Sequence, residues 1–190
     1  MFGASQIIPA GSWVATSSQA GIASAGKHVI DRNTENLLNA VRAAKASNDV
    51  VLVVLHWGIE GNVCPSAVQR SLGARLRAAG ATAVLGAHPH VLQPIVVDVK
   101  PSAASQGPDR GLIAYSMGNF IWDPRSGATG ETGLLELRFN GANLVGHQFH
   151  PHRLDGNGWA SSVDPASPTG KRTTALVANP CPGAKGSAAS

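Results

Sequence analysis

The sequence predicts an α/β protein in which parallel strands alternate with helices before the chain becomes rich in β-structure. Val50–Leu55 is an unbroken run of branched apolar residues, which is typical of a strand covered on both faces. A helical pattern and a second apolar run, Thr82–Leu85, follow it, and this order indicates a right-handed parallel unit. The 190 residues are enough for one domain with its own core, or for a large part of a bigger domain.

Two helices are expected beside these strands. The first runs from Asn33, the expected N-cap, to Ser47, and its apolar residues recur at helical spacing: Leu37, Leu38, Val41 and Ala44. The second begins after Ser66, which has the spacing of a capping box with Gln69. It is expected to end at Gly80, because glycine is favoured directly after a helix.

Beyond Pro94 the pattern changes to short strands separated by turns, while residues 1–32 indicate strand fragments and loop. The expected strands are Ile95–Val99, Leu112–Ser116, Leu134–Phe139 and Leu144–His150. Pro101–Arg110 is expected to be a polar loop, and Asn140-Gly141 is a hairpin signal. Residues 1–153 are therefore assigned to the domain, and the Gly/Ser/Pro-rich residues 154–190 to a tail without regular structure.

Composition and charge exclude several classes of function. The formal net charge is +4, but Lys and Arg are scattered singly, so no nucleic-acid partner is expected. No apolar run approaches the roughly 20 residues of a membrane span, and the first residues lack the pattern of a signal peptide. The sequence also lacks a Gly-x-Ser-x-Gly elbow and the glycine-rich patterns of nucleotide sites.

The two cysteines, Cys64 and Cys181, belong to no metal-binding pattern. Each lies beside proline in a loop-like segment, so two interpretations stay open. One is a disulfide that ties down the tail and implies an oxidising compartment, and the other is two independent thiols.

Three histidines at the ends of the two central strands form a candidate metal site. His88 and His90 follow the second strand, separated by one proline, and His56 ends the first. Functional residues of such sheets lie beyond the carboxyl ends of the strands, so the three imidazoles can converge. Imidazole nitrogens suit a divalent metal such as zinc, manganese or iron. The sequence therefore predicts a metal-dependent hydrolase site.

Other polar residues near these strand ends are candidates for supporting roles. Glu60 is a possible general base, a group that orients a ligand histidine, or a solvated charge. Asn119 follows another strand and can bond a loop backbone or a substrate oxygen, and Asp123 is either a surface carboxylate or an assisting acid. His150 and His152 repeat the His-Pro-His spacing without a second histidine-ended strand, so we interpret them as surface residues.

Three motifs in this order resemble the CapA-type bacterial capsule-synthesis proteins, which are associated with poly-γ-glutamate production. They are His56-Trp57-Gly58-Ile59-Glu60, Gly86-Ala87-His88-Pro89-His90-Val91-Leu92-Gln93 and Tyr115-Ser116-Met117-Gly118-Asn119-Phe120. The resemblance covers residues 1–150 and implies part of a four-layer αββα sandwich of the metallophosphoesterase type. It implies His56, His88 and His90 as metal ligands, with Asn119 in the supporting loop.

The resemblance also implies a role in capsule or poly-γ-glutamate assembly at the cell surface. The implied partners are an anionic polymer, such as poly-γ-glutamate or a cell-envelope polysaccharide, and other capsule-assembly proteins. The family's Gly-Asp, Asn-Leu-Glu and Asn-Asn-His elements do not occur in this sequence, so it corresponds to the C-terminal portion of such a domain. The alternative is a non-catalytic fragment that binds a polymer or a partner through an incomplete metal site.

Overall fold

The computed structural model describes residues 1–26, 31–99, 110–123, 127–178 and 181 of the chain. Helices and strands follow one another in the order β1 (Phe2–Ser5), η1 (Gly11–Trp13), α1 (Arg32–Ser47), β2 (Leu52–His56), α2 (Ala67–Ala78), β3 (Ala83–Ala87), β4 (Ile95–Val99), β5 (Arg110–Ala114), η2 (Gly127–Gly130), β6 (Glu131–Asn140), β7 (Asn143–Leu154), β8 (Ala160–Ser162) and α3 (Pro168–Ala178). The polar loop expected at Pro101–Arg110 lies outside these residues, except for Arg110, which begins β5.

The strands form two sheets. A five-stranded sheet has the order β1-β2-β3-β5-β4, and a three-stranded sheet has the order β6-β7-β8. In the first sheet β1, β2, β3 and β5 are parallel, and β4 runs antiparallel to β5. The predicted parallel strand–helix–strand unit is confirmed as β2-α2-β3, and the hairpin signal at Asn140-Gly141 is confirmed between β6 and β7.

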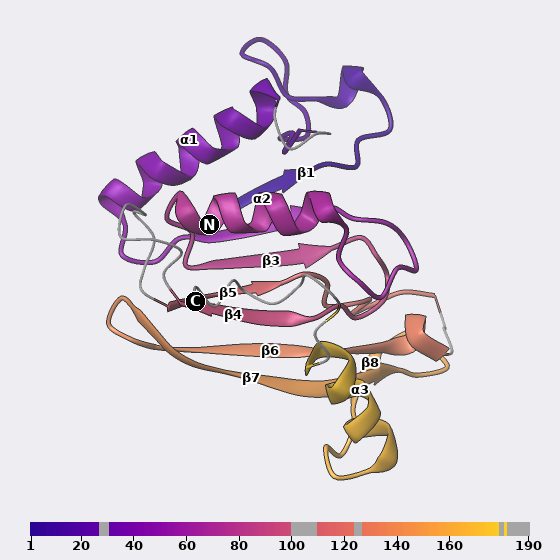
Figure 1. Ribbon diagram of the computed structural model, residues 1–190. Coiled ribbons are helices and arrows are strands. Elements are labelled where there is room, and N and C mark those ends of the chain that lie inside the picture. The colour runs from indigo at the N-terminus through magenta and orange to yellow at the C-terminus, as the bar shows by residue number, and fades with distance from the viewer. Residues whose placement is uncertain (27–30, 100–109, 124–126, 179–180, 182–190) are drawn as a thin grey trace.

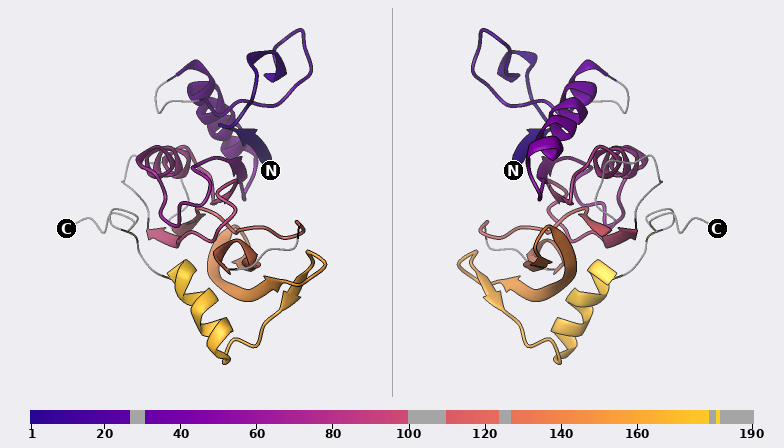
Figure 2. Two further views of the ribbon diagram at one scale, coloured as in Figure 1. Left: turned by 90° about the vertical axis from the view of Figure 1, so that its right-hand side faces the viewer. Right: turned by 90° about the vertical axis from the view of Figure 1, so that its left-hand side faces the viewer.

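The elements are stacked in four layers, with α1 and α2 outermost on one side and α3 on the other (Figures 1 and 2). Buried residues of α1 and α2 form one core with the five-stranded sheet. A second core lies between the two sheets, and α3 contacts β7. The predicted α/β class and αββα order are therefore confirmed for this portion of the fold.

Both faces of the central strands are covered, which explains their unbroken apolar sequence. Along β2, Val53 and Leu55 pack toward the helices, whereas Leu52 packs toward the second sheet. Along β3, Val84 faces the helices, and its neighbours Ala83 and Leu85 face the second sheet. Successive strand side chains point to opposite faces, so burial on both sides selects apolar residues at every position.

The N-terminus of α1 differs from the expectation. Asp31, rather than Asn33, is the N-cap, and its carboxylate accepts a hydrogen bond of 2.8 Å from the backbone N–H of Thr34. Asn33 lies inside the first turn, where its amide donates to the Ser24 hydroxyl at 3.3 Å. Both residue types favour N-caps, so only the extended backbone at Asp31 identifies the one that is used.

Both ends of α2 agree with the sequence analysis. Ser66 and Gln69 form the reciprocal hydrogen bonds of a capping box. At the other end Gly80 adopts a φ of 116° and donates to the carbonyl of Arg77 at 3.1 Å. Ala81 donates to Leu76 at 3.0 Å, which completes a Schellman motif.

The expectation that the tail lacks regular structure is wrong for its described part. Ala160–Ser162 pairs with the end of β7, and Pro168–Ala178 forms α3. Thr173 and Val177 of α3 are buried, and Arg172 pairs with Glu131 at the start of β6. These contacts order a segment whose sequence has no clear periodicity, while the division at residue 153 stays a prediction.

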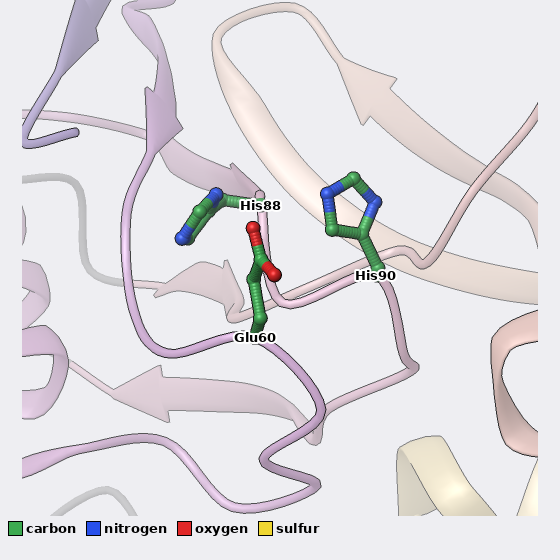
Figure 3. A group of neighbouring side chains, drawn as sticks. All are labelled: Glu60, His88 and His90. Atoms are coloured by element: carbon green, nitrogen blue, oxygen red, sulfur yellow. The ribbon is translucent and has the colours of Figure 1, made fainter. Parts of the chain in front are cut away.

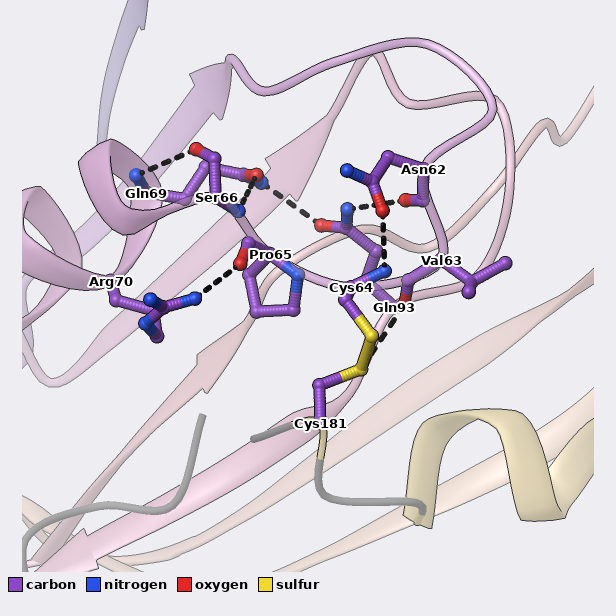
Figure 4. The surroundings of a disulfide bond; sticks show 9 residues. All are labelled: Asn62, Val63, Cys64, Pro65, Ser66, Gln69, Arg70, Gln93 and Cys181. Carbon is purple, nitrogen blue, oxygen red and sulfur yellow. Dashed lines mark hydrogen bonds between the residues drawn. A yellow bond between two sulfur atoms is a disulfide. The ribbon is translucent and has the colours of Figure 1, made fainter. Parts of the chain in front are cut away.

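Cys64 and Cys181 form a disulfide (Figure 4). This confirms the interpretation as a disulfide and excludes two independent thiols. The bond joins residues 117 positions apart and connects the loop before α2 to the chain that follows α3. The bond therefore ties the C-terminal segment to the central α/β unit.

Arg77 gives a direct test of how closely this core is packed. Its side chain is fully buried at the end of α2, and it donates to the carbonyl of Ala81. A Cβ built at Gly111 of β5 would overlap the Arg77 guanidinium, whereas a Cβ at Gly3 of β1 meets nothing within 4 Å. Both glycines lie in strands, so a substitution at Gly3 is a matched control for the same substitution at Gly111.

We expect Gly111→Ala to lower the free energy of unfolding by about 1–3 kcal/mol, the usual cost of overpacking. Gly3→Ala should change it by less than about 0.5 kcal/mol, as surface substitutions usually do. Urea denaturation followed by circular dichroism measures both. Equal stability of the two variants would contradict the packing of Arg77 against Gly111.

Candidate metal centre

The parallel pairing of β2 and β3 brings the predicted site residues to one edge of the sheet. His56, the last residue of β2, lies beside Ala87, the last residue of β3. His88 and His90 follow β3 directly, and Glu60 lies in the loop that leaves β2. The structure therefore assembles side chains from two strand ends at the place where open α/β sheets bind ligands.

Glu60, His88 and His90 form a compact group of metal-type donors. Their ligand atoms all lie within 4.8 Å of one another. Figure 3 shows the Glu60 carboxylate directed toward the space between the two imidazole rings. Among the described residues, no other group of three or more His, Cys, Asp or Glu side chains meets the same condition. One carboxylate and two imidazoles are a donor set that suits zinc, manganese or iron.

The backbone at the two histidines is in an unusual conformation. His88 has a φ of 102° and His90 a φ of 57°, and within the described chain no other residue except glycine has a positive φ. Such conformations cost free energy and persist where surrounding contacts hold them, often at functional sites. Here Pro89 between them is buried and its carbonyl accepts a 2.8 Å hydrogen bond from Gly61. The strained turn is thereby tied to the loop that carries Glu60.

Trp57 and Gly86 form the support beneath this turn. The Trp57 side chain is fully buried, and its indole N–H donates to the carbonyl of Tyr115 at 2.9 Å. A Cβ at Gly86 would overlap both that carbonyl and the indole nitrogen. Glycine is therefore required at position 86. Trp57, which follows β2, links the ends of β3 and β5 through its hydrogen bonds to Ala87 and Tyr115.

His56 lies next to the compact group but is not part of it. Its ring centroid is 4.6 Å from that of His88, and its own position is exposed. Desolvation, followed by the charges of His88 and His90, lowers the pKa of His56 below its ordinary value. Desolvation also lowers the pKa of His88, although the nearby Glu60 carboxylate opposes this shift. Both imidazoles therefore favour the neutral form that a metal ligand needs.

Asn119 orients the His90 ring through a hydrogen bond to Nδ1. Its side-chain oxygen lies 2.6 Å from His90 Nδ1, and its amide nitrogen donates to the carbonyl of Thr129 at 3.0 Å. With the amide in this orientation, His90 Nδ1 must carry the proton and donate it to Asn119. His90 Nε2 is then the nitrogen with a free lone pair, which is the arrangement of a metal-ligating histidine.

Three residues of this site, Gly61, Trp122 and Thr129, were not among the candidates predicted from the sequence. A pocket of about 270 Å³ is lined by Glu60, Gly61, His90, Asn119, Trp122 and Thr129. The centroid of the Trp122 ring lies 4.9 Å from that of the His90 ring, and Trp122 is 47% exposed. The position of Trp122, only three residues after Asn119, was the available signal, but the sequence does not show that its ring meets His90.

Two further expectations concern residues outside the compact group. Asp123 is exposed and does not belong to the group of donors. His150 pairs with Glu136 at 3.1 Å on the second sheet, and His152 bonds the carbonyl of His150 at 3.0 Å. Among the described residues, His150 and His152 belong to no group of three donors whose ligand atoms all lie within 4.8 Å of one another.

The lowered pKa values predict a pH-dependent stability for the metal-free protein. Because His56 and His88 have a folded-state pKa below the ordinary 6.5, the unfolded chain binds more protons in the window just below that value. We expect the free energy of unfolding to fall as pH is lowered from 7 through this window. The His56→Gln/His88→Gln variant should show a weaker dependence. Imidazole proton NMR titration checks the two pKa values directly, and an ordinary value at both histidines would contradict the prediction.

Comparison with known proteins agrees with the motifs at this site. Residues 4–124 match the family model described as bacterial capsule synthesis protein PGA_cap. The chain is 34% identical to the PGA biosynthesis protein CapA of Bacillus subtilis over 60% of its own length and 28% of that protein. It is 33% identical to the capsule biosynthesis protein CapA of Bacillus anthracis over 70% of its own length and 29% of that protein. The chain thus spans less than a third of either relative, and it belongs to the PGA_cap family of bacterial capsule synthesis proteins.

Proposed function

We propose that Glu60, His88 and His90 hold a divalent metal ion, with His56 as a further ligand or close neighbour. The observation that carries this proposal is the convergence of three ligand atoms within 4.8 Å, two of them from histidines on a strained turn. The fit is supported by Asn119, which leaves one nitrogen of His90 available as a ligand. A bound metal would polarise a phosphoryl or amide oxygen and lower the pKa of water. Zinc, manganese and iron all suit these donors.

The side chains beside the three donors have supporting roles in this proposal. Asn119 positions His90, and the pocket beside it is large enough to admit a small polar group of a substrate. Glu60 lies close enough to His88 and His90 to ligate the metal, and it is also the candidate for a general base. Asp123, three residues beyond Phe120 and exposed, is the second carboxylate that could assist from the rim.

We propose that the whole protein acts in capsule or poly-γ-glutamate assembly at the cell surface as a metal-dependent hydrolase-like component. The names of the two relatives support the process, and the metal-type donors support the chemistry. The Cys64–Cys181 disulfide supports an oxidising location outside the cytoplasm. In the described part of the chain no helix has the length and apolar character of a membrane span.

A second candidate function is binding of a polymer or an assembly partner without catalysis. The observation that favours it is a group of large exposed side chains beside the pocket: Phe120, Ile121, Trp122 and Trp159. Ile121 and Trp159 pair through a β-bridge, so the loops that carry these side chains are adjacent. Exposed apolar groups of this kind often mark interaction surfaces.

Metal loading tests the first step of the proposal. We expect the parent chain to retain manganese or zinc after loading and desalting, and His88→Ala/His90→Ala to lose it. His150→Ala/His152→Ala is the matched control, because it removes the other His-Pro-His pair and should leave the metal content unchanged. Elemental analysis measures all three. A metal-free but folded parent would rule out a metal site formed by this chain alone.

Turnover separates the two candidate functions. If the chain is catalytic, phosphodiester or γ-glutamyl model substrates should be hydrolysed only with metal added. Glu60→Gln should then lower the rate by about 100-fold or more, in the range of acid–base groups. Metal binding without hydrolysis of either substrate would favour the binding function, which sedimentation with poly-γ-glutamate would then test.

A further inference from the structure

The loop that carries Glu60 is held by only a few specific contacts. Between the buried Trp57 and Pro65, the large side chains of Ile59 and Val63 are 57% and 46% exposed, so apolar burial contributes little to the position of residues 58–64. Gly61 donates to the carbonyl of Pro89, and the buried Gln93 donates to the carbonyl of Asn62 at 2.7 Å. A loop with few buried contacts opens at low free-energy cost unless something else restrains it.

The disulfide supplies such a restraint from the other end of the chain. Cys64 lies four residues after Glu60, and its partner Cys181 is 8% exposed and follows α3 (Figure 4). The Cys181 sulfur also contacts the carbonyl of Val63 at 3.7 Å. The Glu60 loop is therefore attached covalently to the C-terminal segment.

Helix α3 is joined by an ion pair to the start of β6, which follows Thr129 of the pocket closely in the chain. Arg172 donates to Glu131 at 2.7 Å, and the Glu131 side chain is only 4% exposed. Glu131 comes two residues after Thr129, whose carbonyl accepts the hydrogen bond from Asn119. Asn119 in turn holds His90. The C-terminal segment, α3 together with Cys181, thus reaches the Glu60 loop directly and, through Glu131, the chain that directly follows Thr129.

We propose that α3 and the Cys64–Cys181 disulfide form a C-terminal strap that positions Glu60 and His90 relative to each other. Cys64, Cys181, Arg172 and Glu131 are positioning residues, since none of them lines the pocket. Reduction of the disulfide would release the Glu60 loop while both cores remain intact, so the geometry of the site depends on an oxidising environment.

Hydrogen exchange on the metal-free protein tests the strap directly. We expect Cys64→Ser/Cys181→Ser to speed amide exchange in residues 58–64 by about tenfold or more, without a comparable change in β2 or β3. Leu38→Ala is the control, because it removes a buried side chain of α1, which contributes no residue to the site. If exchange in the loop is unchanged, or rises uniformly as in the control, the disulfide has no positioning role.

The ion pair is tested by a matched pair of variants in α3. Arg172→Gln should speed exchange in residues 129–132, whereas Lys171→Gln removes the neighbouring exposed charge and should leave it unchanged. Equal exchange in the two variants would overturn the role of Arg172.

Metal affinity provides a second measurement, which rests on the proposed function. If the parent binds manganese, removal of the disulfide should weaken binding by about tenfold, as loss of groups that orient metal ligands commonly does. Leu38→Ala should retain the parent affinity under conditions where both variants are folded. Unchanged affinity in the cysteine variant would contradict the strap. A parent that binds no metal would contradict only the proposed function, because hydrogen exchange still decides the strap.

Discussion

The parallel pairing of β2 with β3 is the constraint on which the site depends. The register places His56 beside Ala87, so the loop after β2 and the turn after β3 leave the sheet at the same edge. Helix α2 closes the unit, and its capping residue Gln69 also donates to the buried Gln93 at 2.9 Å. Gln93 then holds the Glu60 loop through Asn62. The hydrogen bonds that define the start of α2 therefore continue into the site.

The site combines a rigid side with a side that is less firmly held. Its rigid side is the turn of His88 and His90, in which unfavourable backbone conformations are maintained by the buried Pro89 and the Trp57 indole below. Its other side is the exposed loop with Glu60, which depends on hydrogen bonds and the disulfide. The group of donors therefore has two imidazoles on the strained turn and one carboxylate on the exposed loop.

The chain belongs to the PGA_cap family of bacterial capsule synthesis proteins. It covers less than a third of each of the two Bacillus proteins that it matches. The α/β unit and the second sheet nevertheless form two continuous cores, and α3 contacts β7. Among the described strands the edge strand β1 pairs only with β2, and its last residue, Ser5, also forms a parallel bridge to Ser24. Chemistry that needs more than three protein donors would require ligands beyond the compact group.

Local patterns in the sequence were sufficient for the α/β class, the ends of α2 and the position of His88 and His90 at the edge of the sheet. Each of these depends on neighbours within a few residues: an unbroken apolar run, a capping box, and two histidines around a proline. Tertiary structure alone decided that Glu60 rather than His56 completes the compact group, that Asn119 orients His90, and that Trp122 lines the pocket. The same is true of α3 and of the disulfide, whose cysteines lie 117 residues apart. Contacts between distant residues leave no periodicity in the sequence, because each is specified by the packing of whole layers.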